Sequence, residues 1–353
     1  MELDFRRLPE FDGHELVLTE TDEKSGLKAF IAIHNTNLGP ATGGTRYWLY
    51  DSEEEALRDA LRLSRAMSYK CALAGVPYGG GKGVILAHPQ KPKTKELIRA
   101  YARCIDKLQG RLYTGEDVGI DPDDVRVMLE ITPFIIGKPG VAGDPSPWAA
   151  LGVFYAIRAA LKSVFGSEDI SGRSFAVKGL GKCGLELARL LSEQGGEILG
   201  ADINQEKIKK AKELLPKIKI VSPEEIHRQK VDLFAPCALS GDLNQKTISE
   251  LRCKIVCGSA NNQLSTIEDG SRLHEASILY IPDYLANAGG LVNVVAELAP
   301  GGYNKSWVEM KTEGIEATAQ KIIDLSKKEM RPTSEISDGL AHEIFLKQAK
   351  INV

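Results

Sequence analysis

The chain has 353 residues, enough for about two domains of ordinary size. Hydrophobic residues make up 43% of it and charged residues 26%, which is typical of a soluble globular protein. The net charge of -3 excludes the basic surplus with which proteins attract nucleic acid or anionic membranes, so we expect neither as a partner. The charged N-terminal segment lacks the apolar core of a secretory signal, and we expect a cytoplasmic protein.

Cysteine and histidine are spaced without any metal-binding pattern. The six cysteines form no C-x-x-C pair and the six histidines form no H-E-x-x-H motif. We therefore expect reduced thiols and no metal site. Because histidine is scarce, an enzyme built on this chain needs another group to move protons.

Residues 1–135 alternate strand-like and helix-like segments. Strand patterns occupy 14–20 and 27–35, and helix patterns occupy 52–67 and 94–109. Ser52 and Glu55 predict a capping box for the first helix, and Thr94 caps the second. Asp121 and Pro122 open a third helix, with aspartate at the cap and proline at the first position.

The glycine- and proline-rich segment 136–147 predicts a connection between domains, since it suits neither a long helix nor a central strand. An apolar helix follows over 148–165, and Arg158 and Lys162 within it indicate an amphipathic helix rather than a membrane span. Short apolar strands then alternate with helical segments, at 174–179, 197–203, 231–236, 254–259 and 277–282. This alternation predicts a parallel sheet covered by helices on both faces.

The clearest motif is a glycine pattern between a strand and a helix. The strand at 174–179 leads into Gly179-x-Gly181-x-x-Gly184, and a second strand ends at Asp202, near the expected spacing of ~20 residues. The first glycine permits the tight turn, the second lets a pyrophosphate approach, and the third allows the helix to pack closely. The helix N-terminus adds partial positive charge. We therefore predict a dinucleotide site.

Two domains follow from these segments. We predict an α/β fold with an N-terminal α/β substrate domain over 1–140 and a Rossmann-type, doubly wound dinucleotide-binding domain over 148–330. The sequence leaves open whether the last helix, at about 333–353, packs back on the first domain. Asp202 favours NAD over NADP, because its carboxylate accepts hydrogen bonds from a ribose and repels a 2′-phosphate. Lys207 is expected on the solvated face of the next helix.

A lysine within four glycines, in GVPYGGGKGVILAHP at 75–89, resembles a phosphate-binding loop only superficially. Val76 occupies the position of the first glycine of a Walker A motif, and Gly83 replaces the magnesium-binding hydroxyl. The motif also needs a following helix, whereas the next residues are strand-like. A nucleoside triphosphate loop is excluded.

Lys82 in this segment, Lys70 upstream and the Glu116-Asp117 pair downstream suggest a site made of two cations and a carboxylate. In such a site one ammonium binds a substrate carboxylate, and the second moves protons near neutral pH. The alternative is that both lysines are ordinary surface residues.

Several motifs together resemble the amino acid dehydrogenase family, most closely its leucine branch. They run in order from about residue 14 to 300 and are LGPATGGTR, MSYKCALAG, GGGKG, TGEDVG, GDPSP, KGLGKCG, FAPCALSG, GSANNQL and PDYLANAGGLVNV. The resemblance implies reversible, NAD-dependent oxidative deamination of an apolar L-amino acid to a 2-oxo acid and ammonia. It also implies a homo-oligomer, from a dimer to an octamer.

Site residues follow from the resemblance by matching motifs. Lys70, helped by Asn262, would bind the substrate carboxylate; Lys82 would activate the attacking water; Asp117 would exchange protons with the amine. Gly79 and Gly80 would let backbone and substrate approach closely. The remaining substrate-binding residues would be Gly43 and Gly44, with Thr42, Gly115, Leu291 and Val294 around the side chain. The cofactor would be held by Gly179, Leu180, Gly181, Lys182, Cys183, Gly184, Asp202, Ile203, Cys237, Ala238, Ala260 and Asn261.

The identity of the amino acid is less constrained. Glutamate enzymes of the family carry a lysine where this chain has Thr42, so a second substrate carboxylate would remain unpaired. Gly115 and Leu291 resemble phenylalanine enzymes and would leave extra room, whereas the GDPSP and LAGVPYGGGK motifs are closer to leucine enzymes. Leucine and its branched-chain relatives are favoured, with phenylalanine as the alternative.

One residue departs from the family pattern. Ala149 stands where the family has a threonine that contacts the nicotinamide carboxamide. This loss leaves a dinucleotide-binding regulator with impaired catalysis as a more distant alternative. A 2-hydroxy acid dehydrogenase is disfavoured, because neither His227 nor His274 lies in a glycine-bounded motif at a strand end.

Overall fold

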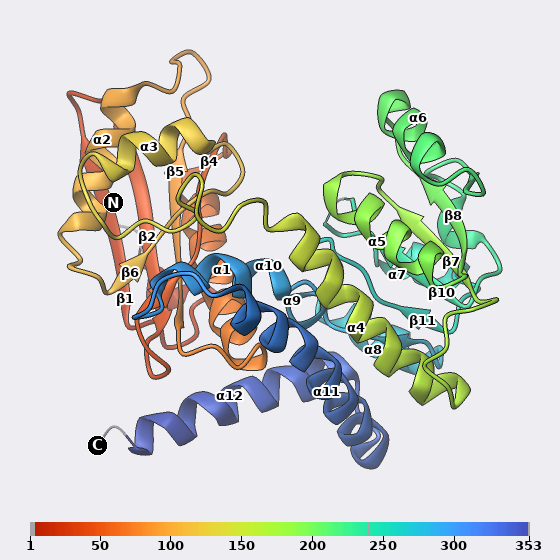
Figure 1. Ribbon diagram of the computed structural model, residues 1–353. Coiled ribbons are helices and arrows are strands. Elements are labelled where there is room, and N and C mark those ends of the chain that lie inside the picture. The colour runs from red at the N-terminus through yellow and green to blue at the C-terminus, as the bar shows by residue number, and fades with distance from the viewer. Residues whose placement is uncertain (1–3, 239, 352–353) are drawn as a thin grey trace. The chain divides into compact units, whose positions relative to one another are not determined.

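A computed structural model describes residues 4–238 and 240–351, which divide into two compact units (Figure 1). Unit 1 comprises Met1–Gly143, Val294–Asn304 and Ala341–Val353. Unit 2 comprises Asp144–Asn293 and Lys305–Leu340. Each unit is an α/β structure, and the fold class predicted from the sequence is confirmed.

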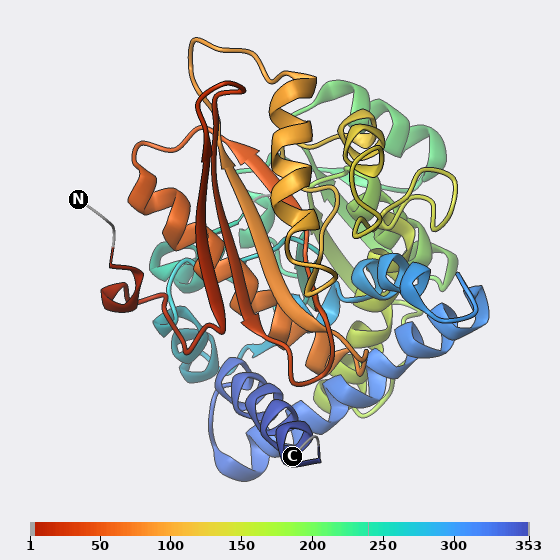
Figure 2. The same cartoon turned by 90° about the vertical axis from the view of Figure 1, so that its left-hand side faces the viewer.

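The sheet of unit 1 is mixed, and the paired strands β1 and β2 form its long antiparallel edge (Figure 2). The strand order is β1-β2-β5-β3-β6, with β4 also paired to β5. β2 runs antiparallel to β1 and β5, whereas β3 and β4 run parallel to β5 and β6 runs parallel to β3. The strands are β1 (Leu16–Asp22), β2 (Leu27–Asn35), β3 (Ala41–Thr42), β4 (Thr45–Trp48), β5 (Gly79–Leu86) and β6 (Leu112–Tyr113).

Helices cover both faces of this sheet. Helix α1 (Glu53–Leu73) packs on the face that carries Phe30, Ala32 and Val84. Helices α2 (Lys95–Asp106) and α3 (Pro122–Leu129) cover the opposite face. Because β2 is buried on both faces, it has the continuous apolar sequence that predicted it.

The helix caps of unit 1 are as predicted, except that one hydrogen bond of the expected Ser52–Glu55 capping box is not formed. Thr94 accepts the backbone N–H of Leu97, and Asp121 forms a capping box. Ser52 accepts the N–H of Glu55, but the Glu55 carboxylate accepts from Asp51 rather than from Ser52. The predicted reciprocal box is therefore incomplete. Helix α1 also continues beyond its predicted end to Leu73, which places Lys70 in its last turn.

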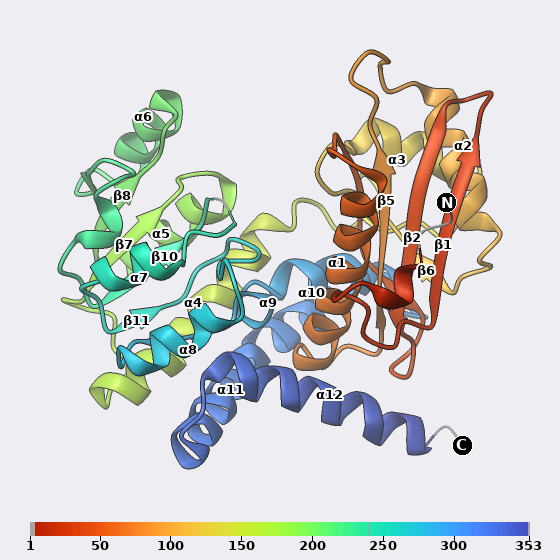
Figure 3. The same ribbon diagram turned by 180° about the vertical axis from the view of Figure 1, so that it is seen from behind.

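Unit 2 has an all-parallel sheet in the order β12-β11-β10-β7-β8-β9. Figure 3 labels its strands β11, β10, β7 and β8. The chain leaves β7 in one direction to β8 and β9, and then returns past it to β10, β11 and β12, as in a doubly wound fold. The strands are β7 (Ser174–Lys178), β8 (Glu197–Ala201), β9 (Lys219–Ile220), β10 (Leu233–Pro236), β11 (Ile255–Val256) and β12 (Leu279–Tyr280). The short β9 is not among the strands predicted from the sequence.

The helices from residue 146 onward are α4 (Ser146–Phe165), α5 (Lys182–Glu193), α6 (Gln205–Leu214), α7 (Gln245–Glu250), α8 (Glu268–Glu275), α9 (Asp283–Ala286), α10 (Gly289–Val295), α11 (Lys305–Glu329) and α12 (Thr333–Ile351). Short 3-10 turns occupy Phe5–Arg7, Ile226–Arg228 and Ala296–Leu298. By length and composition alone α4 is apolar enough to cross a membrane. It packs against α5 and α11, and Val153, Ile157 and Leu161 are fully buried there.

The unit boundaries differ from the expected domains 1–140 and 148–330 in the segment Val294–Asn304, which belongs to unit 1. Glu297 explains this assignment, because its carboxylate accepts the backbone N–H groups of Lys138 and Ala142 at 3.1 and 3.2 Å. At the C-terminus, the ring of Phe345 packs against His34 and Tyr69. A pattern read along the chain contains no signal for such distant contacts.

The glycines of β5 are required by protein packing. A Cβ on Gly80 would stand less than 3.0 Å from the backbone nitrogen of Ser68 in α1. A Cβ on Gly83, which faces the opposite side of the sheet, would also stand less than 3.0 Å from the hydroxyl oxygen of Tyr101 in α2. Gly79 likewise faces the carbonyl of Asn35. The expectation that Gly79 and Gly80 are glycine to admit substrate is therefore wrong, since these positions face other parts of the protein.

We expect Gly83→Ala to lower the free energy of unfolding by roughly 1–3 kcal/mol, because the added methyl must displace the Tyr101 hydroxyl. Denaturant-induced unfolding measures this loss. Gly301→Ala, in the same unit but with no neighbour within 4 Å, is the control and should change stability by less than about 0.5 kcal/mol. Equal stabilities of the two variants would contradict the packing explanation.

Candidate active site and dinucleotide-binding turn

Lys82 lies in the middle of β5 and is almost completely buried, with 3% of its surface exposed. It pairs across the sheet with Ala32 of β2, so its side chain points to the face covered by α1. There the ammonium Nζ donates a hydrogen bond to Oδ2 of Asp117 and forms an ion pair with it. A buried ammonium needs such a partner, because desolvation without one is costly.

Asp117 follows β6 and is held from three sides. Its Oδ2 accepts from Lys82, and its Oδ1 accepts the N–H of Val118 at 2.6 Å and lies 3.6 Å from Nε of Arg46. Burial raises the pKa of Asp117, but the charge and hydrogen bond of Lys82 and the charge of Arg46 outweigh it and lower the pKa to about 2. Asp117 is therefore a carboxylate at neutral pH, whereas Glu116 beside it is exposed.

Lys70 lies in the last turn of α1 and is partly buried. The side chain of Met67, three residues before Lys70, lies next to Gly43, where a Cβ would stand 3.2 Å from the Met67 Cγ. Residues three apart share one side of a helix, so we infer that Lys70 lies on the same side of α1 as Met67, the side that faces Gly43. Gly44 in turn lies against Asp117. The Gly43-Gly44 segment therefore runs between the end of α1 and the Lys82–Asp117 pair.

A chain of buried hydroxyl groups supports this segment. The hydroxyls of Tyr101 and Thr45 lie 2.7 Å apart, as do those of Thr45 and Thr114. Thr114 donates to the carbonyl of Gly43 at 2.9 Å. These three side chains were missed as supports of the site. Tyr101 alone carried a signal, because a tyrosine on a buried helix face requires a hydrogen-bond partner.

The residues predicted to surround the substrate side chain differ in their surroundings from what the sequence suggested. Thr42 is fully buried, and its hydroxyl has no hydrogen-bond partner among the described residues. Gly115 does not leave extra room, because a Cβ there would stand less than 3.0 Å from the carbonyl of Ile136. Leu291 and Val294 both lie in α10, the former in unit 2 and the latter in unit 1.

The glycine turn of unit 2 has the geometry of a phosphate-binding turn. Gly179 has a φ of +100°, and a Cβ on Gly184 would collide with the carbonyl of Gly179. A Cβ on Gly181, by contrast, would meet only the ammonium of Lys207, at 4.0 Å. No side chain caps the N-terminus of α5, so its backbone N–H groups are available to an anion.

Asp202 directly follows β8, and its carboxylate binds the glycine turn. Its Oδ2 accepts the N–H of Leu180 at 2.8 Å, and its Oδ1 accepts the N–H of Asn204 at 2.8 Å. Lys207 lies on the exposed face of α6, as expected, and its ammonium also lies 3.8 Å from Oδ2 of Asp202. Ile203 is 83% exposed beside them.

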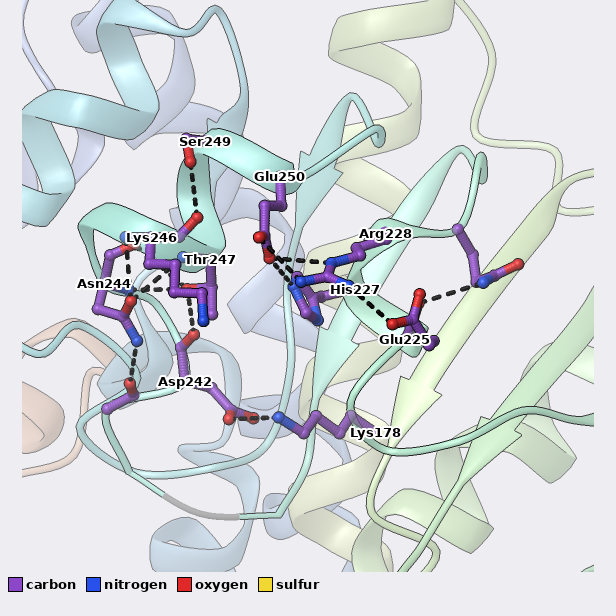
Figure 4. A network of polar contacts seen from close by, with 12 residues as sticks. Lys178, Glu225, His227, Arg228, Asp242, Asn244, Lys246, Thr247, Ser249 and Glu250 are labelled. Atoms are coloured by element: carbon purple, nitrogen blue, oxygen red, sulfur yellow. Dashed lines mark hydrogen bonds and ion pairs between the residues drawn. The ribbon is translucent and has the colours of Figure 1, made fainter.

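Two further loops carry the remaining predicted cofactor contacts. Lys178, just before the turn, forms a 2.6 Å ion pair with Asp242, which precedes α7 (Figure 4). Figure 4 also shows Asn244, which caps α7. Burial raises the pKa of Cys183, also part of the turn, to about 12, so this thiol stays protonated.

Hydrogen bonds from amide side chains stabilise the loop of residues 258–263. Gln263 is fully buried and donates to the carbonyls of Gly258 and Ala260 at 2.8 and 3.0 Å. Asn287 donates to Oδ1 of Asn261 at 2.8 Å. Asn262 has a φ of +52°, a conformation that asparagine tolerates better than most residues. These supports were not found from the sequence.

Other predicted positions are also described. Lys182 forms a 2.9 Å ion pair with Asp144. Ala149 is half-buried near the start of α4, and its Cβ would stand 3.4 Å from a Cβ on Gly290. Within 4–238 and 240–351, no three His, Cys, Asp or Glu side chains gather in a group suited to a metal ion.

Comparisons with known proteins identify the family. Residues 14–133 match the model of the Glu/Leu/Phe/Val dehydrogenase dimerisation domain, and residues 201–335 match the Glutamate/Leucine/Phenylalanine/Valine dehydrogenase model. The chain is 43% identical over 346 residues to a leucine dehydrogenase of Bacillus subtilis, covering 97% of this chain and 94% of that one. It is 45% identical over 319 residues to a phenylalanine dehydrogenase of Bacillus thermotolerans, covering 88% and 83%.

A solved structure resembles the whole chain. The L-tryptophan dehydrogenase of Nostoc punctiforme superimposes with a TM-score of 0.85 at 42% identity, over 96% of this chain and 97% of that one. The family that the motifs predicted is thereby confirmed. The chain belongs to the Glu/Leu/Phe/Val dehydrogenases, the amino acid dehydrogenase family, and is an oxidoreductase acting on the CH–NH2 group of amino acids.

Proposed function

We propose that the protein catalyses the reversible, NAD-dependent oxidative deamination of leucine and related branched-chain L-amino acids. The buried Lys82–Asp117 pair carries this proposal, because it places an ammonium and an ionised carboxylate together inside unit 1. An acid and a base held in contact suit a reaction that moves protons to and from nitrogen and oxygen.

The residues have separate roles in the proposed reaction. Lys70 binds the substrate carboxylate as a fixed charge, with a hydrogen bond from Asn262. The carboxylate of Asp117 accepts a proton from the substrate ammonium, which leaves a neutral amine. Bound NAD supplies the acceptor for the hydride that leaves Cα.

The second half of the reaction is hydrolysis. Lys82 positions the water that attacks the imine carbon and stabilises the negative charge that develops on its oxygen. Asp117 returns its proton to the departing nitrogen, which leaves as ammonia. The attacking water gives up its two protons to solvent as its oxygen becomes the carbonyl oxygen of the 2-oxo acid.

NAD is favoured over NADP by the position of Asp202, whose carboxylate would repel a 2′-phosphate. The residues of the turn fit a dinucleotide, because Gly181 presents open space in front of the uncapped helix α5. Lys207 partly offsets the charge of Asp202, so discrimination against NADP is expected to be incomplete.

A side chain without a second carboxylate is favoured because Thr42 offers no cation to pair with one. Phenylalanine remains the alternative substrate, since phenylalanine and leucine dehydrogenases are about equally similar to this chain. The packing of Gly115 against Ile136 removes one argument for an aromatic substrate. We also expect a cytoplasmic homo-oligomer, which the match to a dimerisation domain supports.

Initial rates of ammonia-dependent NADH oxidation with a panel of 2-oxo acids test the substrate. We expect the highest kcat/KM with 4-methyl-2-oxopentanoate, lower values with phenylpyruvate and indole-3-pyruvate, and the lowest with 2-oxoglutarate. A single methylene changes such ratios by only about 10- to 200-fold in an apolar pocket. Preference for phenylpyruvate would favour the alternative, and oxidation without ammonia would indicate a hydroxy acid dehydrogenase.

Lys82→Ala tests the role of Lys82 in positioning the attacking water and stabilising the charge on its oxygen. We expect it to lower kcat by at least about 100-fold, the usual contribution of one donor to a developing negative charge, with the dissociation constant for NADH unchanged. Lys107→Ala is the matched control, because Lys107 forms an exposed ion pair with Glu20 on the surface of the same unit. Equal activity of Lys82→Ala and wild type would exclude the catalytic assignment.

Ala149→Thr tests the departure from the family pattern. We expect it to restore a hydrogen bond to the cofactor and to tighten NAD binding by about 0.5–1.5 kcal/mol, measured by titration of intrinsic fluorescence. Ala149→Val adds similar bulk without a hydroxyl and should not tighten binding. An unchanged or larger dissociation constant for Ala149→Thr would contradict this prediction.

A further inference from the structure

We propose that Arg46 is a positioning residue that holds Asp117 in place as a carboxylate, and that Asp59 in turn holds Arg46. This inference rests on the proposed function, because it assigns Arg46 a part in the reaction for which Asp117 is the base. Neither Arg46 nor Asp59 was among the site residues predicted from the sequence.

The position of Arg46 is fixed by the sheet. Arg46 lies on β4 and pairs with Val84 of β5, two residues beyond Lys82 on the same strand. Val84 belongs to the cluster under α1, so the Arg46 side chain lies on the same face as Lys82. Only 22% of the side chain is exposed.

The guanidinium of Arg46 connects two carboxylates. Its Nη1 donates to Oδ2 of Asp59 at 2.8 Å, and its Nε lies 3.6 Å from Oδ1 of Asp117. The Nε is buried and makes no hydrogen bond within the described part of the chain. Its interaction with Asp117 is therefore that of a nearby charge, directed at the oxygen that Lys82 does not bind.

Asp59 anchors this arrangement from α1. Its carboxylate has 8% of its surface exposed and accepts hydrogen bonds from the hydroxyl of Tyr50 at 2.6 Å and from Arg62 at 2.8 Å. Burial raises the pKa of Asp59, but these bonds and the charge of Arg46 lower it overall. Asp59 is therefore ionised and fixes Arg46.

The two cations around Asp117 have different tasks. Lys82 must also bind the reacting oxygen of the substrate, so its hydrogen bonds are divided during the reaction. Arg46 is held by Asp59 and has no such second task. It therefore keeps one positive charge next to Asp117 throughout, which holds the carboxylate ionised and in the same orientation.

The pH dependence of the reaction tests this inference. The charged groups that act on Asp117 are Lys82 from β5 and Arg46 from β4, and Arg46 is itself faced by Asp59 and Tyr50. An opposite charge at this distance lowers the pKa of a carboxyl by about 1–3 units, so Arg46→Gln should raise the pKa of Asp117 by that amount. The acid limb of the kcat/KM profile should then move upward in pH.

Arg46→Lys keeps the positive charge, and we expect it to recover most of the wild-type profile. Arg99→Gln is the matched control, because Arg99 forms ion pairs with Glu96 and Glu130 beside α2, on the other face of the sheet. It should leave the profile unchanged. A profile of Arg46→Gln that matches wild type after scaling, or no recovery with Arg46→Lys, would overturn the proposal.

A second measurement is independent of turnover. Aspartate labelled with carbon-13 in its carboxyl group reports the ionisation of Asp117 by NMR titration, with Asp117→Asn to assign the signal. An upward shift of this titration in Arg46→Gln supports the role of Arg46, and an unchanged titration refutes it. If wild type lacked ammonia-dependent turnover, the proposed function would fail while this titration still decided the effect of Arg46.

Discussion

The buried ion pair between Lys82 and Asp117 joins the centre of β5 to the loop that follows β6. An ammonium in the centre of a sheet is tolerated only with a fixed counter-charge, so the loop that carries Asp117 must return to β5. The Thr45–Thr114 hydroxyl contact and the charge of Arg46 hold that loop. The chemistry that we propose for this unit and its packing therefore depend on the same contact.

Much of the fold and part of the candidate site can be predicted from the sequence. The period of the apolar residues predicted β2 and the helices, and the turn with Gly179, Gly181 and Gly184 predicted the doubly wound unit, because these signals are local. Lys82 and Asp117 were found through motif resemblance, and the structure brings them into contact. Their contact itself has no local signal, since they are separated by a helix and a short strand.

The errors have a common physical cause. Gly79, Gly80 and Gly115 were interpreted as space for a substrate, but each faces another backbone segment of the protein. A glycine in a sequence indicates that another group lies close to its Cα. It does not show whether that group belongs to the protein or to a substrate. Arg46 was missed for a related reason, because its partners come from α1 and from the loop after β6. Only tertiary structure distinguishes such a residue from an ordinary surface arginine.

The division of the chain into units has a consequence for how such proteins diversify. The polypeptide passes from one unit to the other after Gly143, Asn293, Asn304 and Leu340. Neither unit is a contiguous stretch, so a single recombination event or one proteolytic cut in the connection at 136–147 cannot separate a complete unit. Exchange of either unit as a whole therefore requires several crossover points in the coding sequence.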